Sequence, residues 1–312
     1  MPELPEVETI RLGLQKSLVG YKIIAVEVKL KKIVSGEIDN IIGATVQEVR
    51  RFGKGLVIDL DNGYSIAAHI KLTGQFIYRD GKTQSLKVSE KVGGKLPNKW
   101  THVIFKLKSQ KARFAARRSK VKTTRLAQAM AKRATQNSKV GDAVLYYNDV
   151  RQFGWIKIVK TEDLQQLPFF KELGPEFLSS LTMQQFSNIV SKANSPIKSL
   201  LMDQKKMSGV GNIYANDALF YARTDPRMKA KTLTDAQVKK LYNAILHVLK
   251  DGLKYGGATV LNFVNALGQE GKYQEHFLVY GREKDPCHVC KTPIQKIKFG
   301  GRGTYFCPAC QR

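Results

Sequence analysis

The chain begins with the stretch Met1-Pro2-Glu3-Leu4-Pro5-Glu6-Val7-Glu8-Thr9. Removal of Met1 would expose Pro2, whose secondary amine belongs to the α-amino class with a pKa of about 8 and is substantially unprotonated at neutral pH. Such an amine attacks electrophilic carbon to form an iminium, and the Glu3 carboxylate is placed to move protons during that attack. A frayed terminus would also fit the dipeptide alone. No charged segment followed by an apolar run is present, so we expect no signal peptide.

The charge of the chain points to a polyanionic partner. The 312 residues suggest one large domain or two, and the formal net charge is +26, from 52 Lys and Arg against 26 acids. DNA, RNA and an anionic membrane surface all fit this charge. The charges are dispersed over the chain, whereas a ribosome-associated or membrane-surface protein would more often carry them in tails. No run of about 18 apolar residues predicts a membrane span.

The four cysteines occur only near the end of the chain, as Cys287-x2-Cys290-x16-Cys307-x2-Cys310. Two Cys-x-x-Cys pairs at this separation supply four thiolates for one tetrahedral Zn²⁺, with no open position for catalysis. We therefore predict one structural zinc ion and a reducing compartment. Between the pairs, residues 300–305 read as the tip of a β-hairpin that exposes Arg302.

The hydrophobic pattern predicts two kinds of structure. Short alternating segments separated by turn residues predict strands of an antiparallel sandwich or barrel in the first half. These strands are expected at 23–30, 45–52, 56–60, 65–69, 76–78 and 102–108. From about residue 160 the period becomes helical, with Ser195 as the expected cap of one helix. The predicted fold class is α+β: an N-terminal helix and β-sandwich, then a helical domain with a zinc-finger hairpin.

Several blocks of the sequence resemble the formamidopyrimidine-DNA glycosylase and endonuclease VIII family. The first is Pro2–Thr9 followed by a helix with apolar Val7, Ile10, Leu14 and Leu18. The others are 69–74, Asp149-x-Arg151-x-Phe153-Gly154, and 195–215, which is similar to the family's helix-two-turn-helix. The resemblance implies that Pro2 is the Schiff-base nucleophile and Glu3 the acid/base. It covers nearly the whole chain except residues 110–140.

The resemblance also assigns roles to further residues. It implies that Lys54 reaches the phosphate beside the lesion, that Leu72 is a wedge in the base stack, and that Arg302 donates in the second elimination. DNA contacts are implied for His69, Leu72, His102, Arg151, Phe153, Asn212 and Arg302. Arg151 would replace the extruded base, with Phe153 in the adjacent gap. Two departures stand out: Leu72 replaces the family's methionine, and Asp217 replaces its glutamate.

The implied function is that of a bifunctional DNA glycosylase and AP lyase for oxidised purines, acting on damaged double-stranded DNA. Residues 268–273 are a glycine-punctuated loop, and Val279-Tyr280-Gly281-Arg282 is like the branch of the family that acts on 8-oxoguanine. An endonuclease VIII-type enzyme for oxidised pyrimidines and a non-catalytic damaged-DNA binder are the alternatives. We expect a monomer without membrane attachment, cytoplasmic and nucleoid-associated in a bacterial type of cell.

We expect three domains: a catalytic β-sandwich at 1–158, a helix-two-turn-helix domain at 159–280 and a zinc finger at 281–312. The stretch 110–140 would be a basic insertion in the first domain, with ten Lys or Arg and no acid. We expect it to add sequence-independent phosphate contacts. A solvated loop without a role and a protein-contacting segment are the other two interpretations. In the second domain, the amides at the start of the helix after Gly211 are expected to face a phosphate.

Overall fold

The computed structural model describes residues 1–110 and 142–312, so the basic insertion lies outside the described residues apart from Gln110. The described chain forms two compact units. Unit 1 comprises Met1, Glu8–Leu167 and Val260–Glu270, and unit 2 comprises Pro2–Val7, Pro168–Thr259 and Gly271–Arg312. Helix α1, Leu4–Leu18, supplies residues to both units. Its predicted apolar stripe is confirmed, because Val7, Ile10, Leu14 and Leu18 are all buried.

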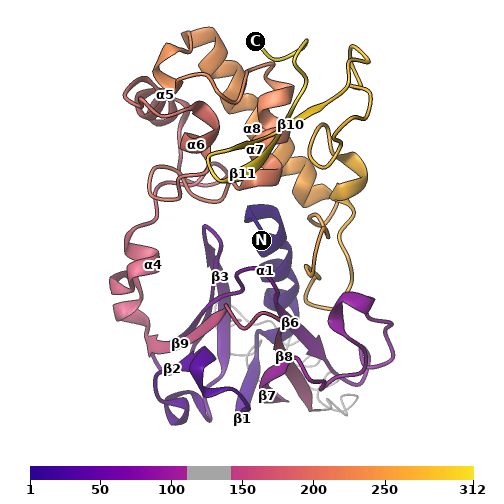
Figure 1. Ribbon diagram of the computed structural model, residues 1–312. Helices are drawn as coiled ribbons and strands as arrows, with labels where there is room; N and C mark the ends of the chain where they lie inside the picture. The colour runs from indigo at the N-terminus through magenta and orange to yellow at the C-terminus, as the bar shows by residue number, and fades with distance from the viewer. Residues whose placement is uncertain (111–141) are drawn as a thin grey trace, which may run out of the picture. The chain divides into compact units, whose positions relative to one another are not determined.

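Two β-sheets form the body of unit 1 (Figure 1). One sheet has the order β1-β7-β8-β6, and the other has the order β2-β9-β5-β4-β3. Neighbouring strands are antiparallel except for the short parallel pair of β2 and β9. The strands are β1 Tyr21–Val28, β2 Val34–Ser35, β3 Val46–Phe52, β4 Gly55–Leu60, β5 Tyr64–His69, β6 Gly74–Arg79, β7 Thr101–Ser109, β8 Ala143–Asp149 and β9 Trp155–Lys160. Each of the six predicted strands is present within three residues of its expected ends.

Unit 2 is built from helices and one hairpin. The helices are α4 Pro168–Lys171, α5 Met183–Ser191, α6 Ile197–Leu201, α7 Asn212–Tyr221 and α8 Asp235–Lys254, and the hairpin strands are β10 Gln295–Phe299 and β11 Arg302–Phe306. Short 3-10 turns connect them at Ala230–Thr232 and Tyr273–His276. The predicted α+β class, with a helix-two-turn-helix segment and a C-terminal hairpin, is confirmed.

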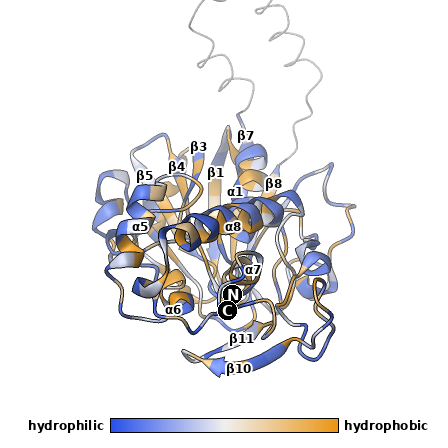
Figure 2. Ribbon diagram, turned by 90° about the horizontal axis from the view of Figure 1, so that it is seen from above, coloured by the Kyte–Doolittle hydropathy of each residue, from blue (hydrophilic) through white to orange (hydrophobic). Residues whose placement is uncertain are grey.

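The core of unit 2 lies around α7. Eight consecutive residues of this helix, Ile213–Phe220, are buried, so it is covered on all sides. Helix α8 is amphipathic and carries both hydrophobic and hydrophilic residues in Figure 2, and its apolar face joins the same core. Thr182 and Thr234 each begin a helix with a capping box. No helix in the described part of the chain is long and apolar enough to cross a membrane.

One local prediction was wrong. Ser195 does not cap α6; the residue before the helix is Pro196, and it makes no side-chain cap hydrogen bond. The backbone of both residues is instead bonded to the segment 229–230: Ala230 N donates to Ser195 O at 3.0 Å, and Pro196 pairs with Lys229 as an isolated bridge. Because of this long-range pairing, the helix begins at Ile197.

Candidate active site

The carboxylate of Glu3 is bound by the first turn of α7. Ile213 N donates to Oε1 at 2.9 Å and Tyr214 N donates to Oε2 at 3.3 Å. Free amides at a helix N-terminus carry partial positive charge, and here they hold the two carboxylate oxygens of Glu3 in place. The sequence predicts that such amides face a DNA phosphate. That prediction is wrong for these two, because the anion they bind is the protein's own Glu3.

Two glycines allow the N-terminal segment to approach α7 closely. A Cβ on Gly211 would lie 2.3 Å from Glu3 Cδ, and one on Gly209 would lie 2.5 Å from Leu4 Cδ1. Gly209 also has a φ of +100°, a backbone conformation that other residues rarely adopt. Its carbonyl accepts from Leu4 N at 3.0 Å. The Gly-x-Gly pattern is therefore explained by the packing of Glu3 and Leu4.

The hairpin tip exposes Arg302, as predicted from sequence. Gly300 and Gly301 both have positive φ, at 57° and 72°, which is the geometry of a two-residue type I′ turn. Phe299 and Arg302 form the pair that closes the turn. The arginine is exposed on the first residue of β11.

Three polar side chains fasten this hairpin to the helices of unit 2. Lys198 Nζ donates to Gly303 O at 3.0 Å and to Thr304 Oγ1 at 2.7 Å. One N–H of the Asn212 amide donates to Gly303 O at 3.0 Å, and Asn216 Oδ1 accepts from Tyr305 N at 2.8 Å. Together these bonds fix the strand that begins at Arg302.

Lys198 is a site residue that sequence reasoning missed. Its side chain is buried, and burial lowers the pKa of its ammonium group to about 7, with Arg302 acting in the same direction and Glu3 against it. The lysine thus interacts electrostatically with both Glu3 and Arg302. A buried lysine in the segment 195–204 carried no signal in the sequence, because its partners lie about a hundred residues away.

Asp217, the departure from the family pattern, has a structural role here. It is fully buried and accepts from Val279 N at 3.0 Å and from Tyr280 N at 3.1 Å. Burial raises the pKa of this carboxyl group to about 6. The shorter side chain therefore anchors α7 to the segment that leads into the zinc finger.

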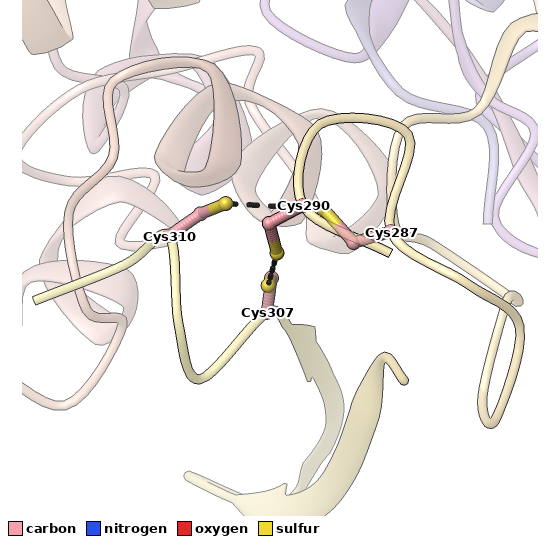
Figure 3. A group of neighbouring side chains, drawn as sticks. All are labelled: Cys287, Cys290, Cys307 and Cys310. Carbon is pink, nitrogen blue, oxygen red and sulfur yellow. Dashed lines mark hydrogen bonds between the residues drawn. The ribbon is translucent and has the colours of Figure 1, made fainter. Parts of the chain in front are cut away.

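The four cysteine thiols converge on one point (Figure 3). All four Sγ atoms lie within 4.8 Å of one another, with Cys287 and Cys310 at 3.9 Å and Cys290 and Cys307 at 3.4 Å. Tetrahedral Zn–S bonds of about 2.3 Å place sulfurs about 3.8 Å apart, so the cluster fits a zinc ion. With four thiolates and no open position, the site is structural, as predicted.

In unit 1, Lys54 lies in the turn between β3 and β4. Gly53 has a φ of +56°, and Arg51 Nη1 donates to its carbonyl at 2.8 Å. Arg51 Nε in turn donates to Glu8 Oε2 at 2.7 Å. The turn is thereby held by an ion pair, and Lys54 itself is buried rather than solvated.

His69 ends β5 as a neutral imidazole. Burial, together with the charges of Lys71 and Lys54, lowers the pKa of His69 to about 3. Lys71 N donates to its Nδ1 at 2.9 Å, so the ring proton is on Nε2. Leu72 comes next in the same turn and is half-buried. A neutral histidine with a donor at Nε2 suits contact with an anionic oxygen.

Asp149, to which the sequence assigned no role of its own, organises the loop that carries Arg151 and Phe153. Its carboxylate accepts from Thr73 Oγ1 and from Gly154 N, the latter at 2.8 Å. His102 Nε2 donates to the Asp149 carbonyl at 2.8 Å, so this edge of the His102 ring holds the same loop. A phosphate contact of His102 would have to use its other nitrogen.

The loop presents an exposed aromatic ring beside a cation. Phe153 is 55% exposed, and the Arg151 guanidinium lies 4.8 Å from its ring centre. Gly154 is required, because a Cβ there would lie 1.9 Å from the Tyr147 hydroxyl. An exposed phenylalanine on a fixed loop is unusual for a residue of the core and is typical of a binding surface.

Three family models match the chain: the formamidopyrimidine-DNA glycosylase N-terminal domain at 1–156, the formamidopyrimidine-DNA glycosylase H2TH domain at 173–264, and the zinc finger found in FPG and IleRS at 284–312. The formamidopyrimidine-DNA glycosylase of Pelotomaculum thermopropionicum is 38% identical over 100% of this chain and 99% of its own. That of Listeria monocytogenes is 35% identical over the whole of both chains. The chain belongs to the formamidopyrimidine-DNA glycosylase family.

Solved structures of the Lactococcus lactis Fpg are similar over the full length. Three of them cover 100% of both chains with a TM-score of 0.77 and 29–30% identity. They are complexes with DNA containing an abasic site, an N7-benzyl-Fapy-dG and an oxidised pyrimidine, respectively. The family resemblance stated from the sequence blocks is thus confirmed.

Proposed function

We propose that this protein is a bifunctional DNA glycosylase and AP lyase of base excision repair that removes oxidised purines, 8-oxoguanine and formamidopyrimidines, from double-stranded DNA. The observation that carries the proposal is the binding of Glu3 by the α7 amides, directly beside Pro2, in a member of this family. A nucleophile needs an acid/base fixed within hydrogen-bond reach of the reacting sugar, and this arrangement supplies one.

The proposed reaction begins with Pro2 as an amine. Its nitrogen attacks C1′ of the damaged nucleotide as the bond from C1′ to the base breaks, and the leaving base takes up a proton from solvent. Glu3 takes the proton that the Pro2 nitrogen loses and passes it to the sugar ring oxygen as the ring opens. The resulting iminium acidifies C2′, so a proton is lost there and the 3′ phosphate leaves by β-elimination. A second, δ-elimination releases the 5′ phosphate, with Arg302 as the proposed proton donor. Hydrolysis of the iminium frees Pro2.

The remaining roles concern DNA. Lys54 and Asn212 contact phosphates beside the lesion, and His69 and His102 contact the backbone. Leu72, Arg151 and Phe153 fill the space left by the extruded nucleotide, since chemistry on a base in a duplex requires its extrusion. Residues 1–158 act as the catalytic domain, 159–280 as the helix-two-turn-helix domain and 281–312 as the zinc finger. We place this monomer in the bacterial cytoplasm, on the nucleoid.

Oxidised pyrimidines are a second candidate lesion class, because one structure of the Lactococcus lactis relative contains such DNA. The discriminating experiment uses duplexes that carry either 8-oxoguanine opposite cytosine or an oxidised pyrimidine. We expect faster single-turnover cutting of the 8-oxoguanine duplex, and a covalent complex when borohydride is added. An absence of both cutting and trapping on every lesion would leave only the non-catalytic DNA binder.

Replacing Glu3 by Gln should separate the two activities. Glutamine can still accept the Ile213 amide but cannot protonate the sugar oxygen, so base excision should fall by about 10²–10⁴-fold. A preformed abasic site already has its aldehyde, so cutting of that substrate should fall much less. Rates on the two duplexes under single-turnover conditions make the comparison. An equal loss on both substrates would contradict the acid role.

Arg302→Ala should retain zinc and fold but lose lesion cutting, because the side chain of Arg302 is exposed and is not one of the four zinc ligands. We expect the rate of cutting to fall by about 10²-fold or more, which is the usual effect of removing a hydrogen-bond donor that stabilises charge developing in a transition state. The matched control is Lys298→Ala, which removes an exposed cation from the facing strand. This control should alter only the salt dependence of binding. Comparable losses in cutting from both variants would show that Arg302 acts by charge alone.

A further inference from the structure

Glu6 is a buried carboxylate that the reaction described above does not use. Its side chain accepts three hydrogen bonds: from Glu3 N to Oε2 at 2.7 Å, from the Tyr214 hydroxyl to Oε1 at 2.7 Å, and from Ala258 N to Oε1 at 2.8 Å. Only 1% of the residue is exposed. All of these residues belong to unit 2. A buried acid is costly unless each of its lone pairs is satisfied, so this arrangement demands an explanation.

The first of these bonds acts on the peptide that carries the proposed nucleophile. The N–H of Glu3 lies in the planar peptide unit that joins Pro2 to Glu3, so fixing this N–H fixes the plane to which the Pro2 ring is attached. The neighbouring bonds from Leu4 N to Gly209 O and from the α7 amides to Glu3 restrain only atoms on the C-terminal side of this peptide. The Glu6 carboxylate thus binds the Pro2–Glu3 peptide group itself.

The other two bonds connect Glu6 to rigid parts of unit 2. Tyr214 is completely buried in α7 and stacks on Tyr273 with ring centres 5.0 Å apart. Ala258 comes directly after Gly256 and Gly257, whose positive φ values of 71° and 83° turn the chain sharply after α8. Glu6 therefore joins the start of the chain to α7 and to the turn after α8.

We propose that Glu6 is a positioning residue, which as a carboxylate holds the Pro2–Glu3 peptide in the one orientation that points the amine and the acid at the same sugar. This role rests on the function proposed above. Three donors converge on Glu6, so only a group with two acceptor oxygens satisfies all of them. An amide supplies one oxygen, and its NH₂ group must then face at least one donor.

The charge state of Glu6 links this role to pH. Burial raises the pKa of Glu6 from 4.5 to about 7, and repulsion by Glu3 adds a smaller rise. The three hydrogen bonds that Glu6 accepts act in the opposite direction and lower its pKa. The titratable groups facing it are Glu3 on the same segment and Tyr214 on α7, with Tyr273 behind Tyr214 and bonded to Asp217. The ionised form, which accepts all three bonds, increases as pH rises through about 7. Excision should therefore rise over the same interval.

The same shift has a consequence for stability. Between pH 4.5 and about 7 the folded protein keeps a proton on Glu6 that the unfolded chain has lost, so the free energy of unfolding falls as pH rises through this window. Glu6→Gln does not titrate. Its free energy of unfolding, relative to that of the wild type, should therefore increase across the window.

The test compares Glu6→Gln with the wild type on a duplex that carries 8-oxoguanine opposite cytosine. We expect the single-turnover rate at pH 8 to fall by about 10- to 100-fold, because a small misplacement of a reacting group has an effect of this order. The dissociation constant for a duplex with an uncleavable abasic analogue should change less than about threefold, and the rise of the rate near pH 7 should disappear. Tyr214→Phe removes one donor only, and should give a smaller loss and move the rise to higher pH.

The matched control is Asp59→Asn. Asp59 is a buried carboxylate in unit 1 that also accepts three hydrogen bonds, two from Arg50 and one from the Ser65 hydroxyl, and none of these partners is a proposed site residue. This variant should keep the wild-type pH profile.

If wild-type protein does not cut the duplex, the proposed function fails. If wild-type protein cuts and Glu6→Gln matches it in rate and pH profile, or if Asp59→Asn shows the same changes, the positioning role is overturned. If Glu6→Gln does not fold, Tyr214→Phe decides by the same criteria.

Discussion

A chain with one extra residue before Pro2 should neither form a borohydride-trapped complex with 8-oxoguanine DNA nor cut it. The extension converts the secondary amine of Pro2 into an amide, which has no nucleophilic lone pair. The rate should fall by about a thousandfold or more, as in other enzymes that lose the nucleophile. The structure accommodates a residue before Pro2, since Met1 is 44% exposed while Pro2 and Glu3 are buried, so the loss should come from the chemistry alone.

The control is the same extended chain after a protease has removed the extension. Trapping and cutting should return together once Pro2 is again the first residue. Pro2→Gly is a weaker test, because glycine also offers an amine. An extended chain that binds a duplex with an abasic analogue as tightly as the mature chain would show that only chemistry was lost. Undiminished trapping by the extended chain would disprove the N-terminal nucleophile.

Local sequence patterns predicted the elements of this fold well. The apolar residues of α1 recur at helical spacing, so this helix follows from periodicity. Strands β4 and β5 pair across Asp61-Asn62-Gly63, so this hairpin follows from turn chemistry. The Cys-x-x-Cys spacing predicted the zinc site because the ligands within each pair are close in sequence. Each of these features depends on residues that are near one another along the chain.

The contacts between side chains within the site could not be predicted from the sequence. Glu3 and Glu6 bind residues 210 and 252 positions away, respectively, and Lys198 binds residues of the hairpin 105 and 106 positions away. No local pattern reports such pairs. The same reason explains the error at Ser195, where a bridge to 229–230 overrides a plausible cap. The roles of Glu6, Lys198 and Asp149 became apparent only from geometry.

Removal of zinc should abolish lesion cutting while leaving unit 1 folded. The small hydrophobic cluster under the hairpin has five buried members, Phe220, Val279, Cys287, Ile294 and Cys307, and two of these are metal ligands. Zinc binding by such modules contributes about 10 kcal/mol or more, so the cluster alone should not hold the hairpin without the metal. The bonds from Lys198, Asn212 and Asn216 would then lose their partners on β11. Arg302 would no longer be presented at a fixed position.

Hydrogen exchange on chelated protein measures this loss directly. Amides of β10 and β11 should lose protection, whereas those of β4 and β5, whose residues are almost all buried in unit 1, should keep it. Cutting of 8-oxoguanine DNA should fall to background and return when Zn²⁺ is restored. Cys290→Ser should reproduce the effect of the chelator, because it removes one of the four thiolates. If the metal-free protein keeps both its hairpin protection and its activity, the hairpin is held by the side chains of Lys198, Asn212 and Asn216, and the zinc ion does not position Arg302.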